Sequence, residues 1–193
     1  MPDAYHFALF LHLLGVFGIA GTATTELVCL SMMRRARTAQ ELRPWADVAN
    51  LIEKAFPVAA LVLLLSGAYM VSKDSALGWD LGWINVSATA LIVGAIADFL
   101  INGRRVGAIQ AAAQAAPDGP VSPALAAQLH DPVVFGTAHA LTLMLLAVIW
   151  NMTTHPGDAQ AGIVVVVAVL LGAGSAMPMV ARRRAILESG PER

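Results

Sequence analysis

Charged residues and cysteine are both scarce in this chain. Only 13% of its 193 residues are Asp, Glu, Lys or Arg, whereas 58% are hydrophobic and the mean hydropathy is +0.68. Soluble domains carry about 25% charged residues, because water must solvate their surface. This shortage, together with long uncharged runs, indicates an integral membrane protein. The single cysteine, Cys29, excludes an internal disulfide and a cluster of thiolate metal ligands.

The start of the chain lacks the positive segment of a cleavable signal peptide. Its first ten residues, MPDAYHFALF, contain no Lys or Arg, and the apolar run that follows is longer than a signal-peptide core. We therefore expect the first span to stay in the mature protein. The sequence also lacks an HExxH motif, a nucleophile–base arrangement and a phosphate-binding glycine loop, so no catalytic residue is assigned and we do not expect an enzyme.

Five stretches are long and apolar enough to cross the ~30 Å hydrocarbon core as helices, which takes about 20 residues each. The predicted fold is all-α, a polytopic membrane helix bundle that forms a single transmembrane domain over residues 1–193. The spans run approximately over 7–33, 56–71, 81–102, 133–152 and 161–180, with loops at 34–55 and 103–132. The capping-box pattern TAQE at 38–41 predicts a short interfacial helix in the first loop, and the second span is expected to extend back through VANLIEKAF.

Positive charge is distributed very unevenly between the two sides of this five-span arrangement. One side holds Lys73, and the other holds 11 of the 12 Lys and Arg residues: Arg34, Arg35, Arg37, Arg43, Lys54, Arg104, Arg105, Arg182, Arg183, Arg184 and Arg193. By the positive-inside rule, the N-terminus faces out and the C-terminus is cytoplasmic. The expected location is a bacterial-type inner (plasma) membrane. Topology accounts for the basic residues, so nucleic-acid binding is not expected.

Several polar side chains fall inside the spans, where an ionisable group costs at least ~2.5–3.5 kcal/mol at the centre of the bilayer. Glu26 precedes Arg34 by eight residues, Asp98 precedes Arg104 by six, and His139 follows Pro132 by seven. At 1.5 Å per residue these depths are all ~9–12 Å. The sequence therefore predicts an intramembrane polar cluster of Glu26, Asp98, Asn102 and His139. Local pairing with arginines, or with a threonine hydroxyl for His139, is the plain structural alternative.

A second polar group lies toward the outer side, with His12 in the first span and Met152 and His155 at the end of the fourth. His12 and Glu26 are 14 residues apart, about four helical turns, so they share one face to within ~40°. Gly15, Ile19 and Ala23 lie between them, and small residues let another helix approach closely. We expect this face of the first span to turn toward the bundle.

Three kinds of function fit these residues: haem or metal binding, small-cation transport, and a non-catalytic structural role. His12 and His139 are candidate ligands of haem b, because neutral imidazole is a common haem ligand, although the two differ by ~15 Å in depth. His12, His155 and Met152 are candidate ligands of a copper ion, because imidazole and thioether suit Cu(I). The alternatives are a small-cation transporter, carrying copper or coupled to protons, and a non-catalytic membrane subunit held together by small residues.

The first three spans resemble a group of small membrane proteins. FLHLLGVFGIAG at 10–21 is similar to the first span of copper-resistance-D-like and protoporphyrinogen-oxidase-like small membrane proteins. FPVAALVLLLSGAYMV at 56–71 and GWDLGWINVSATALIV at 78–93 look closer to an uncharacterised predicted integral membrane protein family. The similarity covers roughly residues 8–105, and His12 matches the first-span histidine. The haem-associated relatives imply haem or metal binding linked to membrane redox chemistry, whereas the copper-resistance relatives imply metal import. The expected partners are the lipid bilayer and either a second copy of the chain or a membrane redox partner. Glu26 and Asp98 match no motif of these families.

Overall fold

The structure is a computed structural model that describes residues 3–188, so Arg193 lies outside it. Its elements are α1 (Ala4–Arg35), α2 (Ala39–Lys73), α3 (Gly82–Asp98), the π-helix η1 (Phe99–Gly103), α4 (Arg104–Ala115), α5 (Pro123–Leu129), α6 (Pro132–Thr154), α7 (Asp158–Gly174) and α8 (Met177–Glu188). Five helical stretches are long and apolar enough to cross a membrane: 4–35, 39–73, 82–115, 123–154 and 158–188. The prediction of an all-α membrane protein with five spans is confirmed at this level.

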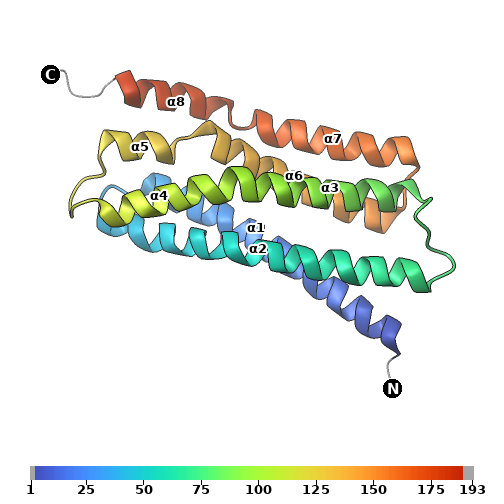
Figure 1. Cartoon of the computed structure of the whole chain (residues 1–193). Helices are drawn as coiled ribbons and strands as arrows, with labels where there is room; N and C mark the ends of the chain where they lie inside the picture. The colour runs from blue at the N-terminus through green and yellow to red at the C-terminus, as the bar shows by residue number, and fades with distance from the viewer. Residues whose placement is uncertain (1–2, 189–193) are drawn as a thin grey trace.

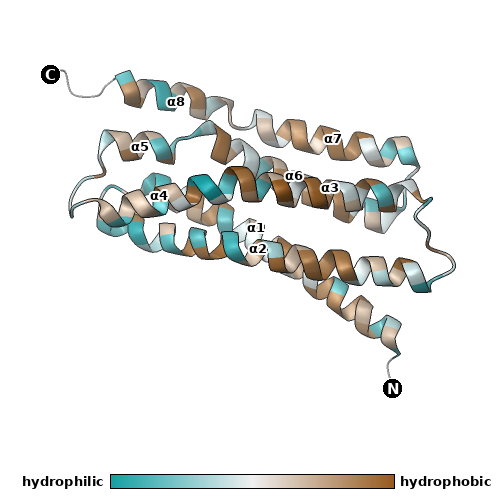
Figure 2. Cartoon of the chain, in the orientation of Figure 1, coloured by the Kyte–Doolittle hydropathy of each residue, from teal (hydrophilic) through white to brown (hydrophobic). Residues whose placement is uncertain are grey.

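The helices lie side by side in an elongated bundle (Figure 1). α1 packs along α2, and α6 packs against α3 and α7. One end of the bundle, which we call the arginine end, contains the α1–α2 turn, α4, α5 and α8; the opposite end contains the α2–α3 and α6–α7 links. Apolar residues dominate the middle of the long helices, and polar residues gather toward the arginine end (Figure 2). This distribution suits a bundle whose middle lies in lipid.

α2 is longer and more continuous than the sequence predicts: residues 39–73 form one helix, where a short interfacial helix within the loop at 34–55 and a second span extending back through VANLIEKAF were expected. Thr38 caps its start by accepting a hydrogen bond from the backbone of Glu41, as the TAQE pattern predicts. The helix also passes through Pro44 and Pro57, and packing against α4 and α1 compensates for the backbone hydrogen bonds that the prolines cannot donate. The interfacial segment and the second span are therefore a single element.

The last span also differs from its predicted bounds of 161–180. α7 ends at Gly174, and the chain turns at Ser175 and Ala176 before α8 begins at Met177. Pro178 lies in the first turn of α8, where its missing N–H is tolerated. This break lets α8 pack against α5 and α6 at the arginine end.

Two apolar cores fill the bundle. The end core lies at the arginine end, where its buried members are Cys29, Leu30, Met33, Leu42, Ala46, Ala49, Val106, Ile109, Ala113, Leu125, Val134 and Ala138. The central core lies further along the spans, where its buried members are Ile19, Ala60, Leu63, Ala90, Leu91, Met144, Leu145 and Val148. A short segment of α1, α2 and α3 between these two cores carries polar residues instead.

Glycine permits the closest helix contacts. A Cβ at Gly15 would lie 2.9 Å from Leu63 Cα, and one at Gly172 would lie 2.5 Å from the backbone nitrogen of Ala140. Real side chains do not tolerate such distances, so any larger residue would push α1 from α2 or α7 from α6. The small residues predicted on the first span therefore do face another helix.

Candidate functional site

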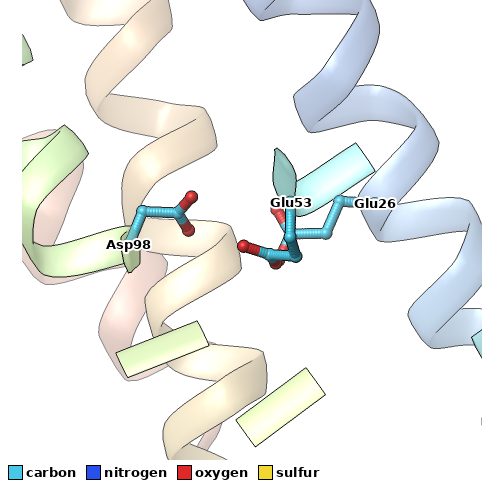
Figure 3. Close-up of side chains that lie close together, drawn as sticks. All are labelled: Glu26, Glu53 and Asp98. Carbon is cyan, nitrogen blue, oxygen red and sulfur yellow. The ribbon is translucent and has the colours of Figure 1, made fainter. Parts of the chain in front are cut away.

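Three carboxyl groups from three helices meet between the two apolar cores. Glu26 of α1, Glu53 of α2 and Asp98 of α3 each place one oxygen so that all three oxygens lie within 4.8 Å of one another. Their side chains point toward a common centre (Figure 3). We call these residues the carboxylate trio.

Each member of the trio lies on the buried stripe of its helix. In α1 the buried positions 15, 19, 23 and 26 follow the helical repeat, and in α3 the buried positions 84, 87, 91, 94 and 98 do the same. Asp98 is only 3% exposed and Glu26 only 8%. Glu53 itself is partly exposed, but both of its carboxyl oxygens are buried. The same packing that forms the bundle therefore turns all three carboxyl groups inward.

Asn102 completes the group from the π-helix that follows Asp98. It is fully buried, and its amide nitrogen donates a hydrogen bond to Glu26 Oε1 at 2.9 Å. A π-helical turn is rare and is found disproportionately at functional sites, because it changes the direction of the side chains that follow it. Here the π-turn at 99–103 lies immediately after Asp98 and brings Asn102 onto Glu26.

Four oxygen positions in this group receive no hydrogen bond from an N–H or hydroxyl group among residues 3–188, although a proton shared between carboxyl groups would let Glu53 pair with Glu26 and Asp98. They are Glu53 Oε1 and Oε2, Asp98 Oδ1 and Asn102 Oδ1. Buried polar atoms are normally paired, and an unpaired one costs about 1–3 kcal/mol, more when it is charged. Several unsatisfied acceptors aimed at one point indicate that the site holds a donor or a cation.

No basic side chain in the described part of the chain forms an ion pair with the trio. The ion pairs found there join Asp3 to His6, Arg43 to Asp118, and Asp131 to Arg105 and Arg183. Three ionised carboxylates in a membrane would repel one another strongly, because the surroundings screen charge far less than water does. Since residues 3–188 supply no ion-pair partner, the positive charge that offsets the trio would be bound protons or a metal ion.

The trio is enclosed on both sides. A small cavity extends from Glu26 and Asp98 toward the middle of the spans, between α1, α2, α3 and α6, and Thr142 is its other polar side chain. The central core closes that side, and the end core closes the other. A cation held here would have packed apolar residues on both sides along the bundle, with the partly exposed Glu53 at its flank.

The oxygen atoms suit a hard divalent cation. Carboxylate and carbonyl oxygens are the ligands preferred by Ca²⁺, Mg²⁺ and Mn²⁺. Two oxygens on opposite sides of a Ca²⁺ ion, each at about 2.4 Å, are about 4.8 Å apart, and the oxygens of the trio lie within that limit. Asn102 Oδ1 offers a fourth ligand, and water or second carboxylate oxygens would complete the shell.

His139, which the sequence places in the same cluster, lies apart from the trio. Its Nδ1 is 2.6 Å from Ser175 Oγ in the α7–α8 turn, and its ring contacts Phe135. The neighbouring Ala138 lines the cavity instead. Consecutive residues on a helix are rotated by about 100°, so His139 has the predicted depth but faces away from the trio.

The residues predicted to bind haem or copper have separate neighbours. His12 Nδ1 is 3.1 Å from the carbonyl of Leu63 in α2, so its face of α1 does turn toward the bundle. His155 adopts a left-handed backbone conformation and stacks on Trp83 at 4.3 Å, and Met152 packs against the central core. Each of these side chains therefore has its own neighbours, and haem or copper binding by His12, His139, His155 and Met152 stays a prediction.

Glu53 is the member of the site that the sequence analysis missed. It lies in VANLIEKAF, through which the second span was expected to extend, but it was given no role, although a helical repeat was readable there: Ala46, Ala49, Ala60 and Leu63 are buried, and residue 53 lies on the same stripe. Pro57 adds a second signal, because it cannot donate to the carbonyl of residue 53 four positions earlier. A glutamate on an otherwise small and apolar helix face is the pattern to look for.

Comparisons of the chain with models of known families, with curated proteins and with solved structures find no match. The resemblance of residues 8–105 to copper-resistance-D-like and protoporphyrinogen-oxidase-like proteins therefore stays a prediction.

Proposed function

We propose that this chain is a membrane protein that binds a hard divalent cation at the carboxylate trio and carries it through the membrane. The observation on which the proposal rests is the meeting of Glu26, Glu53 and Asp98 within 4.8 Å, with unpartnered buried oxygens and no basic partner among residues 3–188. Carboxylates inside a membrane are costly, and they commonly mark ion pathways.

Enclosure of the site supports transport rather than permanent structural binding. The trio lies between the end core and the central core, so an ion could leave only when one of them opens. A site closed on both sides is what a carrier needs while its cargo changes sides. Of the functions weighed from the sequence, small-cation transport is therefore favoured over haem binding.

Orientation is part of the proposal. Ten of the 12 Lys and Arg residues belong to the segments around the arginine end or to the adjoining tail, which supports a cytoplasmic arginine end in a bacterial-type plasma membrane. Thiol labelling of intact cells tests this orientation, since Ser75 and Ala124 are exposed at opposite ends of the bundle. A membrane-impermeant reagent should label Ser75→Cys in intact cells and Ala124→Cys only after lysis. The reverse result would overturn the orientation.

Binding is tested by titrating the purified protein in detergent with Mn²⁺ and measuring the free ion by its paramagnetic resonance signal. Wild type should bind one Mn²⁺, and Glu26→Gln, Glu53→Gln and Asp98→Asn should each weaken binding at least tenfold, because each removes a charged ligand. Asp80→Asn is the matched control, since Asp80 is an exposed acid in the α2–α3 link. Equal binding by all five proteins would refute the site.

Transport is tested separately, in proteoliposomes that contain a dye quenched by Mn²⁺. Wild type should quench the dye faster than empty liposomes, and Asp98→Asn should not. Binding without uptake would mean that the chain is a cation-binding membrane subunit and not a carrier.

A further inference from the structure

Arg34, at the end of α1, has a half-buried charge that is held by neutral groups. Its guanidinium donates hydrogen bonds to Ser31 Oγ at 3.3 Å and Met179 Sδ at 3.6 Å, and it lies 4.0 Å from the centre of the Phe135 ring. In the part of the chain that the structure describes, no carboxylate forms an ion pair with Arg34. Its charge therefore lacks a counterion among residues 3–188.

The neighbouring side chains add charge of the same sign. The charges of Arg182 and Arg35 repel that of Arg34. Asp131 is the acid here, but it already pairs with Arg105 and, at 3.7 Å, with Arg183, and it caps α6. Arg183 Nε is buried without a hydrogen-bond partner among residues 3–188. Among residues 3–188, Asp131 is thus the one carboxylate that pairs with guanidinium groups at this corner, and Arg34 and Arg182 are left without it.

The break between α7 and α8 creates this concentration of charge. Because the chain turns at Ser175 and Ala176, α8 folds back onto α5 and α6 and brings Arg182 and Arg183 beside the ends of α1 and α6. The corner is at the level where the apolar spans end. Apolar side chains exposed next to it are Val133, Met177 and Val180.

We propose that this corner binds the phosphate headgroup of an anionic phospholipid, with Arg34 and Arg182 as its main donors. A guanidinium can donate two parallel hydrogen bonds to a phosphate. The ring of Phe135 packs against the guanidinium of Arg34 and fixes its orientation. Basic pockets between spans at the membrane surface are suited to such headgroups. The exposed apolar side chains would lie against the acyl chains, which a free phosphate ion lacks. This site is separate from the carboxylate trio and does not depend on cation binding.

Lipid binding is tested by native mass spectrometry of the detergent-purified protein, titrated with phosphatidylglycerol or with phosphatidylcholine of the same chain length. Wild type should prefer phosphatidylglycerol. Arg34→Gln and Arg182→Gln should each lower its affinity about fivefold, since one basic residue near the surface contributes about 1 kcal/mol. Arg37→Gln is the matched control, because it removes an exposed charge at the same end, and it should change the affinity less than twofold.

Arg182→Gln keeps the test valid if Arg34→Gln disturbs packing, because Arg182 is exposed on α8. Equal losses in Arg37→Gln and Arg182→Gln would show general surface attraction and overturn the proposal. Equal binding of the two lipids by wild type would overturn it as well. Inorganic phosphate alone should not raise the thermal midpoint; a rise equal to that given by phosphatidylglycerol would mean an anion site rather than a lipid site.

Discussion

Replacing Glu53 with Gln should make the metal-free protein more stable while removing its response to cations. The substitution keeps the shape of the side chain but removes one of three acidic groups that lie within 4.8 Å. Its new amide also supplies N–H donors to the carboxyl groups of Glu26 and Asp98. The stability gain and the functional loss have one cause, which is the removal of charge from the trio.

The size of the gain follows from the geometry. At 4.8 Å and an effective dielectric constant of about 20, two carboxylates repel each other by about 3.5 kcal/mol. Relief of a single ionised pair would therefore raise the thermal midpoint by about 7–14 °C, at roughly 2–4 °C per kcal/mol for a chain of this length. Partial protonation of the trio reduces the gain, so a rise of about 5 °C is the expected lower end.

Thermal unfolding in detergent, followed by intrinsic tryptophan fluorescence, measures both effects. In EDTA the midpoint of Glu53→Gln should exceed that of wild type, and Mn²⁺ should raise the midpoint of wild type alone. Asp80→Asn, an exposed acid, should behave as wild type. A lower midpoint for Glu53→Gln in EDTA would show that the three acids form a stabilising hydrogen-bond network, which refutes the reasoning.

Three further predictions concern single positions. Asn102→Ala should weaken Mn²⁺ binding by about 10–100-fold in the same titration, because it removes both the donor to Glu26 and a candidate ligand oxygen. His12→Ala should change the Mn²⁺ affinity by less than twofold relative to wild type. A larger loss would show that His12 belongs to the cation site. Gly172→Ala should lower the thermal midpoint because its Cβ would enter the backbone of α6, whereas Gly174→Ala, with open space around it, should not.

Hydropathy and charge were enough to predict the five spans, because length and apolarity are read directly along the chain. The link at 34–55 was harder. Its polar composition suggested a loop, but its residues fold as the first half of α2, since Leu42, Ala46 and Ala49 are buried in the end core. That burial depends on α4 and α5, whose positions the sequence does not reveal locally.

Depth alone was a partial guide to the site. Glu26, Asp98 and Asn102 were predicted at one level and do lie near one another, with Asn102 hydrogen-bonded to Glu26. His139 shares that level but faces Ser175, because the rotation of α6 about its axis was not considered. The π-turn that carries Asn102 toward Glu26 has no recognisable sequence signature. Helix rotation, rather than depth, decided which residues meet.

The most direct test of cation binding at the trio is the position of a bound ion in crystals grown with Mn²⁺. Anomalous scattering at the manganese edge should give one peak, within about 2.0–2.6 Å of an oxygen from each of Glu26, Glu53 and Asp98. The peak should be absent in crystals of Asp98→Asn. A peak at His12 or His155 instead, or no peak between the three carboxyl groups at saturating Mn²⁺, would contradict the account.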